Sequence, residues 1–189
     1  MIIKKLVLNR DKQTVFGLSD VARIVGQTPD QNLISAVSYY VKQGDLIRLS
    51  KGLYALDQNY LAEELGNKLR TPSYLSLYSV LQPMGIVFQP YESFYLISRR
   101  NERREIGENK FVYRKIKDEI LLNPLGLERE GAVVRASVER ALLDKLYLDG
   151  EEHFDNLRQV DWDKMARLNR EVYRRQTLDQ YIVEMRKYA

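Results

Sequence analysis

The segment from Phe16 to Leu56 carries two short helical patterns separated by a glycine, followed by two short strand patterns. Apolar residues recur close to helical spacing from Leu18 to Val25, and Gly26 then ends the first pattern. Thr28-Pro29-Asp30-Gln31 opens the second pattern, which stops at Gly44. This order predicts two short helices joined by a tight turn.

Polar residues before each helical pattern indicate where the helices begin. Ser19 can cap the first helix. Thr28 is a suitable N-cap for the second, with Pro29 in the first helical position and Gln31 completing a capping box. The residues of the second helix that we expect to be buried are Leu33, Ile34, Val37, Tyr40 and Val41.

Two short strands are expected next, over residues 46–49 and 53–55, joined by Ser50-Lys51-Gly52. A helix, a turn, a second helix and a hairpin with a basic tip are typical of a winged helix-turn-helix. The usual task of that unit is to place a helix in a groove of double-stranded DNA. We therefore expect the second helix to be the one that contacts DNA.

Polar side chains lie away from the apolar stripe of that helix and on the hairpin. Gln and Asn can read adenine edges, Ser and Tyr can hold phosphates, and basic residues of the hairpin can reach the DNA backbone. The candidate DNA-binding residues are Gln31, Asn32, Ser35, Ser38, Tyr39, Lys42, Arg48 and Lys51. The alternatives are a solvated helix face and a surface for protein contacts.

The rest of the chain predicts a second domain. Residues 57–70 are expected to form a helical joint, and a further helix is expected to begin at either Thr71 or Ser76. Strand patterns cover 94–98, 111–116, 120–122 and 132–136, with a charged connector over 99–109, and Ser137 caps a strong helix. The predicted fold class is α+β: an N-terminal winged helix-turn-helix domain over residues 1–60, then a mixed α/β domain over 66–189 with a helical C-terminal tail from Asp161 to Tyr188.

Composition limits the chemistry that the chain can perform. The net charge of +4 permits nucleic-acid binding without requiring it. The chain has no cysteine and one histidine, His153, so neither a zinc site nor Cys–His catalysis is expected, and no cofactor or metal is implied. No apolar run approaches the ~18 residues that span a bilayer, and the first residues lack a secretory signal. We expect a cytoplasmic protein with no membrane partner.

Three motifs resemble those of one protein family. They are KGLYAL at the hairpin, PSYLSLYSVL from Pro72, and VVRASVERALLDKLYL from Val133. In order and spacing they are similar to motifs of the AbiEi antitoxins of bacterial type IV toxin–antitoxin systems, over roughly residues 13–150. Two positions depart from the family pattern: Val80 replaces the usual Ala, and Lys51 stands where Arg is common.

The resemblance implies an antitoxin and not an enzyme. Its N-terminal domain would bind the operator of its own promoter and repress its own operon. Its C-terminal domain would counter a nucleotidyltransferase-like toxin, without a stable complex. The motif residues of that domain are Tyr74, Ser76, Glu139, Arg140 and Asp144.

The residues alone leave two other functions open. Arg140 and Asp144 are spaced to pair at i,i+4 on one helix, which favours a structural role. A nuclease-like enzyme would need a further carboxylate, for which Asp118 or Glu119 are the nearby candidates. The other alternative is a winged-helix transcriptional regulator with a sensing C-terminal domain and no toxin partner. We expect the connector arginines, Arg99 to Arg104, to be solvated and partly self-paired.

Overall fold

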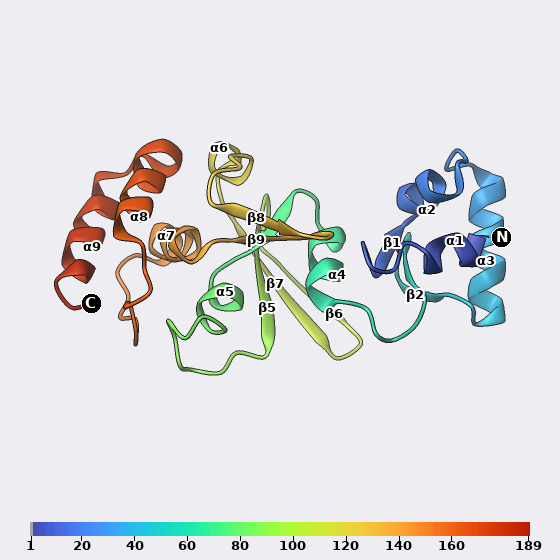
Figure 1. Ribbon diagram of the computed structural model, residues 1–189, viewed down its shortest axis with the longest axis horizontal. Coiled ribbons are helices and arrows are strands. Elements are labelled where there is room, and N and C mark those ends of the chain that lie inside the picture. The colour runs from blue at the N-terminus through green and yellow to red at the C-terminus, as the bar shows by residue number, and fades with distance from the viewer. Residues whose placement is uncertain (1) are drawn as a thin grey trace. The chain divides into compact units, whose positions relative to one another are not determined.

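The computed structural model describes residues 2–189, so Met1, where the first predicted domain begins, lies outside the described residues. The chain is a mixed α+β protein of two compact units (Figure 1). The first unit comprises the chain up to Arg70 together with Glu130–Val133, and the second comprises Thr71–Arg129 and Val134–Ala189. Within the described residues, no helix is both long and apolar enough to cross a membrane.

The first unit contains a three-stranded antiparallel sheet in the order β1-β3-β2. Its elements are α1 (Ile2–Val7), β1 (Val15–Gly17), α2 (Leu18–Val25), α3 (Gln31–Gln43), β2 (Ile47–Ser50), β3 (Leu53–Ala55) and α4 (Ala62–Leu69). The strands expected over 46–49 and 53–55 are present, whereas β1 was not predicted. Three residues are too few to show alternation, and β1 forms because it pairs with β3, with Val15 opposite Ala55.

Helices α2 and α3 of the first unit begin at other caps than the sequence predicted. Gly17 is the N-cap of α2, and its N–H donates to the Asp20 carboxylate at 3.0 Å. Asp30 caps α3 by accepting from the N–H of Leu33 at 2.9 Å. The prediction that Ser19, Thr28 and Pro29 start these helices, with Gln31 completing a capping box, is therefore wrong. Asp30 is as good an N-cap as Thr28, and the Asp20 carboxylate accepts from the Gly17 N–H at the start of α2.

Glycines end both helices as predicted. Gly26 and Gly44 adopt left-handed φ angles of 73° and 82°, which cost glycine little. The buried side of α3 is narrower than expected: Leu33 and Val37 are buried, but Ile34 is 37% exposed. Ile34 follows Leu33 directly, and the 100° step between neighbours turns it away from the core.

Helix α4 is tied to β1 and α2. Glu64, buried on α4, accepts hydrogen bonds from the backbone N–H and the hydroxyl of Thr14 at 2.7 and 2.8 Å. Lys68 forms an ion pair with Asp20 at 2.7 Å and also donates to the carbonyl of Val15. The segment expected to be a joint is thus, from Ala62 onward, a part of the first unit.

The second unit is built on a six-stranded mixed sheet in the order β6-β7-β5-β4-β9-β8. Its strands are β4 (Ser73–Leu75), β5 (Ser93–Ser98), β6 (Glu102–Ile106), β7 (Asn109–Lys115), β8 (Leu127–Glu130) and β9 (Val133–Ala136). The central strand β4 runs antiparallel to β5 and parallel to β9. The strands predicted over 94–98, 111–116 and 132–136 are confirmed, with small differences at their ends.

Three local predictions in this unit are wrong. The helix start at Thr71 is wrong, because Ser73–Leu75 form β4; the alternative start at Ser76 is close, since the short helix α5 (Tyr78–Leu81) has Leu77 as its N-cap. The strand expected over 120–122 belongs to α6 (Asp118–Leu121), because so short an apolar run does not distinguish helix from strand. The charged connector contains β6, and in it Arg104 pairs with Glu102 at 2.6 Å.

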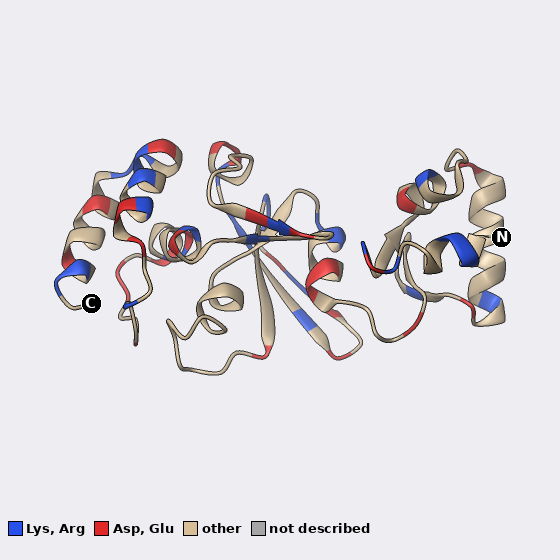
Figure 2. Cartoon of the chain, viewed as in Figure 1, with Lys and Arg blue, Asp and Glu red and all other residues tan. Residues whose placement is uncertain are grey.

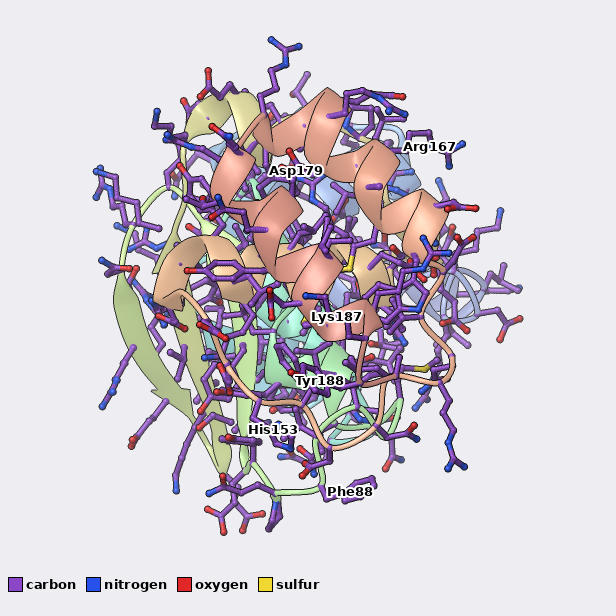
Figure 3. All side chains as sticks on the ribbon, turned by 90° about the vertical axis from the view of Figure 1, so that its left-hand side faces the viewer. Phe88, His153, Arg167, Asp179, Lys187 and Tyr188 are labelled. Carbon is purple, nitrogen blue, oxygen red and sulfur yellow. The ribbon has the colours of Figure 1, made fainter. Side chains whose placement is uncertain are left out.

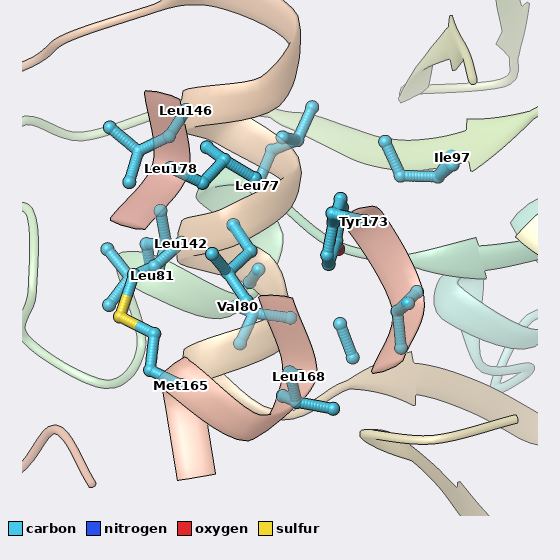
Figure 4. Packing of buried hydrophobic residues seen from close by; sticks show 14 of the residues in the cluster. Leu77, Val80, Leu81, Ile97, Leu142, Leu146, Met165, Leu168, Tyr173 and Leu178 are labelled. Carbon is cyan, nitrogen blue, oxygen red and sulfur yellow. The ribbon is translucent and has the colours of Figure 1, made fainter. Parts of the chain in front are cut away.

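The helices that follow the sheet enclose the larger core. They are α7 (Val138–Asp149), capped by Ser137 as predicted, α8 (Trp162–Leu168), the π-helix η1 (Asn169–Tyr173) and α9 (Gln176–Arg186). Figure 4 shows Leu142 and Leu146 of α7 packed among Leu81, Met165 and Leu178. Helix α7 therefore lies at the centre of this core, which agrees with its nearly complete burial.

Candidate functional site

The outer face of α3 and the β2–β3 hairpin carries all the residues predicted to bind DNA. Each of the eight is exposed: Gln31, Asn32, Ser35, Ser38, Tyr39, Lys42, Arg48 and Lys51. Six of them lie on one helix whose other side is held in the core by Leu33 and Val37. The structure thus brings the six side chains of α3 together on one supported helix face, and it leaves Arg48 and Lys51 exposed on the hairpin.

Few of these side chains are engaged within the part of the chain that the structure describes. Ser38 donates its hydroxyl to the carbonyl of Ile34 at 2.8 Å, and the Tyr39 ring meets that of Tyr40 edge-on at 5.6 Å. Within residues 2–189, the other six make neither a side-chain hydrogen bond nor an ion pair. Their donors and acceptors are therefore available to a ligand.

The hairpin is fixed to the start of α2. The carbonyl of Gly52, at the turn, accepts from the N–H of Leu18 at 3.2 Å. Gly52 has a φ of 75°, which a residue with a Cβ adopts only at a cost. The register between β2 and β3 shifts between Arg48 and Ser50, which marks a bulge. Lys51 therefore stands at the tip of a constrained turn.

Charge is unevenly distributed on this surface. Within α3, Lys42 is the only charged residue, and Figure 2 shows most of that helix without charge of either sign. Arg48 and Lys51 add two cations from the hairpin. A polyanion on this face would meet neutral hydrogen-bonding groups along the helix and positive charge at Lys42 and on the hairpin.

A buried polar network in the second unit joins motif residues that lie far apart in the sequence. Asp144 of α7 accepts hydrogen bonds from Ser76 at 2.7 Å and from Tyr74 at 3.1 Å. A third hydroxyl, that of Tyr173 in η1, donates to the same carboxylate at 2.7 Å. All four residues are buried. The sequence offered no sign of Tyr173, because its neighbours follow an ordinary apolar helical pattern.

Arg140 is fully buried and is held by backbone carbonyls and aromatic rings. Its Nη2 donates to the carbonyl of Ile120 at 2.6 Å, and its Nη1 donates to those of Asn123 and Leu125. The guanidinium lies 5.3 Å from the ring centre of Tyr74 and 5.5 Å from that of Tyr173. The network thus clamps α7 to α6, the sheet and η1.

The i,i+4 pair expected between Arg140 and Asp144 is indirect. The hydroxyl of Tyr74 lies between them, accepting from Arg140 Nη2 at 3.3 Å and donating to Asp144. Burial raises the pKa of the Asp144 carboxyl, against the opposing effects of the Arg140 charge and the hydroxyl donors. Burial also raises the pKa of the Tyr74 and Tyr173 hydroxyls well above the usual value, so both remain protonated donors.

Glu139 joins the start of α7 to α8. Its carboxylate pairs with Lys164 at 2.7 Å and accepts from the Ser137 hydroxyl at 2.8 Å. Burial alone would raise the pKa of Glu139, but the Lys164 and Ser137 contacts hold it below the usual value. All five motif residues of the predicted C-terminal domain are therefore buried in the fold, and none presents its side chain to a partner from the surface.

The second unit has hollows that offer room for a ligand or a part of one. One, of about 650 Å³, is lined by apolar and acidic groups, and Figure 3 shows His153 and Tyr188 on that face. His153 is exposed, as expected for a lone surface histidine. Another hollow, of about 280 Å³, is lined by polar groups around Arg174 and Arg175, and a neighbouring one of about 410 Å³ shares these arginines. Among residues 2–189, no group of three or more His, Cys, Asp or Glu side chains is placed to hold a metal ion.

Comparison with known proteins finds a distant structural neighbour. No protein-family model and no curated protein match the chain. Among solved structures, the chain is similar to the crystal structure of the RV2827C protein from Mycobacterium tuberculosis, with 14% sequence identity and a TM-score of 0.49. The match covers 95% of this chain and 73% of that one.

Proposed function

We propose that the first unit is a winged helix-turn-helix that binds operator DNA, and that the protein is an antitoxin that represses its own operon. The observation that carries the DNA-binding part is the exposed row of polar side chains on α3, together with the exposed cations of the β2–β3 hairpin. In this proposal α3 lies in the major groove, where Gln31 and Asn32 are suited to read adenine edges. Lys42, Arg48 and Lys51 contact the phosphates.

The antitoxin part of the proposal is supported by the resemblance of three motifs to the AbiEi antitoxins. In the second unit, four of the five motif residues, at the end of β4 and on α7, meet in one buried network: Tyr74, Ser76, Arg140 and Asp144. Their role in this proposal is to hold the unit in the shape that counters a nucleotidyltransferase-like toxin. The contacting surface itself must then consist of other, exposed residues, because the motif side chains are buried.

The test of DNA binding compares the chain's own promoter with a shuffled duplex at matched salt. Asn32→Ala or Gln31→Ala should relax sequence preference at one or two base pairs and cost about 1–3 kcal/mol where a bidentate contact is lost. Lys51→Ala should weaken binding to all sequences alike and reduce the salt slope by about one unit. Lys12→Ala, a charge-matched change in the exposed loop before β1, is the control and should alter neither the affinity for DNA nor the salt slope. Equal affinity for promoter and shuffled DNA would contradict a specific operator.

The test of the antitoxin role is growth rescue. Residues 71–189, co-expressed with the product of the adjacent open reading frame, should restore growth without repressing the promoter. Residues 1–70 should repress without rescue. Rescue by the first fragment alone would reverse this division.

The second candidate function is a winged-helix transcriptional regulator whose C-terminal unit senses a ligand and has no toxin partner. The hollows of about 650 and 280 Å³ in the second unit favour this alternative, because a sensor needs a ligand pocket. Growth that is unaffected by the adjacent gene, together with operator binding that changes with a small molecule, would distinguish it from the antitoxin.

A further inference from the structure

The backbone of Arg174 has a conformation that is unusual for a residue with a side chain. Its φ and ψ are 55° and 50°, and among residues 2–189 only Leu77 shares a positive φ without being glycine. Arg174 directly follows the π-helix η1, and its N–H donates to the carbonyl of Asn169 at 2.6 Å. Left-handed non-glycine residues and π-helical turns both carry an energetic cost and gather at functional sites.

Asn169 holds this turn in place from the interior. Its buried side chain donates to the carbonyl of Arg175 at 2.8 Å and accepts from the N–H of the same residue at 3.3 Å. It also donates to Asp179 on α9 at 2.7 Å. The surrounding structure therefore fixes the unfavourable backbone, and two adjacent arginines are held at the surface.

Those arginines line two neighbouring hollows. The first, of about 280 Å³, is also lined by Lys117, Tyr147 and Tyr173. The second, of about 410 Å³, shares Arg174 and Arg175 and adds Arg170, Gln176 and Asp179. Figure 3 places Asp179 near the start of α9, at the far end of that helix from Tyr188. Arg174 and Arg175 thus stand between two concave surfaces.

The charges of these arginines are not neutralised by carboxylates. Arg174 makes no side-chain hydrogen bond or ion pair within residues 2–189, and the Arg175 guanidinium lies over the ring of Tyr147 at 5.7 Å from its centre. Of the two acids that line the smaller hollow, Glu119 lies 3.7 Å from Lys117, and Glu171 has no ion pair in the described chain. The hollow thus has three cations and two anions, a difference of one positive charge.

We propose that the hollow around Arg174 and Arg175 binds the phosphate group of a small anionic metabolite. Guanidinium groups match phosphate oxygens in a bidentate fork, which lysine and neutral donors do not. At about 280 Å³ the space lies just below the range of whole small-molecule pockets and suits a phosphate or diphosphate group whose remaining atoms extend outward. This site lies in the second unit and is separate from the DNA-binding surface proposed for α3.

Occupation of this hollow should also stabilise the second unit. Tyr173 lines it, and the hydroxyl of Tyr173 donates to Asp144 in the buried network. A ligand that binds the folded unit but not the unfolded chain raises the melting temperature of the unit by mass action. Thermal shift therefore reports binding alongside direct calorimetry.

The experiment titrates the full chain with orthophosphate, pyrophosphate and a nucleoside triphosphate at constant ionic strength, with sulfate as the control anion. At least one phosphate should bind and raise the melting temperature more than sulfate does. The compound that binds most tightly identifies whether the ligand is free phosphate, a diphosphate or a nucleotide. No binding by any of the three at millimolar concentration would overturn the proposal.

Four variants locate the site. Arg174→Gly should weaken binding at least tenfold and, because it relieves the left-handed strain, should raise the melting temperature of the unliganded chain. Arg175→Gln should also weaken binding tenfold, whereas Glu171→Gln should tighten it severalfold by removing a negative charge. Arg167→Gln, on the exposed side of α8, is the matched control and should change nothing. The proposal would be overturned if Arg167→Gln and Arg174→Gly lost phosphate affinity equally. It would also be overturned if Arg174→Gly weakened binding of duplex DNA and left phosphate binding unchanged.

Discussion

Asp144 is the residue on which most buried polar contacts of the second unit converge. Replacing it with alanine leaves the hydroxyls of Ser76, Tyr74 and Tyr173 without their acceptor and the buried Arg140 charge without compensation. Removing one partner of such a buried network costs about 3–5 kcal/mol. Urea unfolding of Asp144→Ala should show this loss, whereas Asp118→Ala, an exposed carboxylate paired with Arg99, should cost under about 1 kcal/mol. Lost growth rescue with unchanged stability would instead give Asp144 a direct functional role.

The pH dependence of stability should distinguish Asp144 from its neighbour Glu139. The pKa of Asp144 is raised in the folded chain above the ordinary 3.8, so its favourable contribution is complete below that value and is lost as pH rises through the folded pKa. Glu139 has a lowered pKa, so its contribution is present above 4.5 and is lost as pH falls through the folded pKa. The free energy of unfolding of the wild type minus that of Asp144→Asn should therefore fall with rising pH. The same difference for Glu139→Gln should rise with pH. Parallel curves would contradict these assignments.

Helix α3 provides a direct comparison of two candidate caps. Asp30 accepts from the N–H of Leu33, whereas Thr28 lies outside the helix. Asp30→Ala should cost about 1 kcal/mol of helix stability, and Thr28→Ala should cost little. Native-state hydrogen exchange of the α3 amides measures the change for each variant. A larger loss of protection in Thr28→Ala than in Asp30→Ala would show that Thr28 is the N-cap, as predicted from the sequence.

The sequence predicted elements best where a local signal decides the structure. Gly26 and Gly44 end helices because only glycine takes a left-handed φ at little cost, and Ser137 caps α7 as expected. The strands β1, β4, β6 and β8 were missed, since short or charged strands form through pairing with distant partners. The exposed row on α3 follows from helical spacing. The arginine pair beside η1 does not, because no sequence pattern foretells a π-helix or the φ of Arg174.

At the scale of the whole molecule, the boundary between the units lies later than residue 60. Leu65 is fully buried on α4, and Glu64 and Lys68 bind β1 and α2. A fragment ending at residue 60 therefore loses the burial of Leu65, worth about 1.5–3 kcal/mol. It also leaves the N–H and the hydroxyl of Thr14 without the Glu64 carboxylate that accepts from them. We expect residues 1–70 to melt at a higher temperature than residues 1–60 by differential scanning calorimetry. Equal melting temperatures would show that α4 adds nothing to the unit.

The buried network also governs when each half of the chain can become native during synthesis. Ser76 and Asp144 are made well before Tyr173, yet the carboxylate needs the Tyr173 hydroxyl to complete its set of donors. On the ribosome, the segment up to Arg70 can mature while the rest is still emerging. The remainder must wait until Tyr173 has been made. A nascent chain would thus present its first helices and hairpin before the second unit is finished. A premature stop shortly before Tyr173 would therefore leave the first unit folded and prevent the second unit from folding.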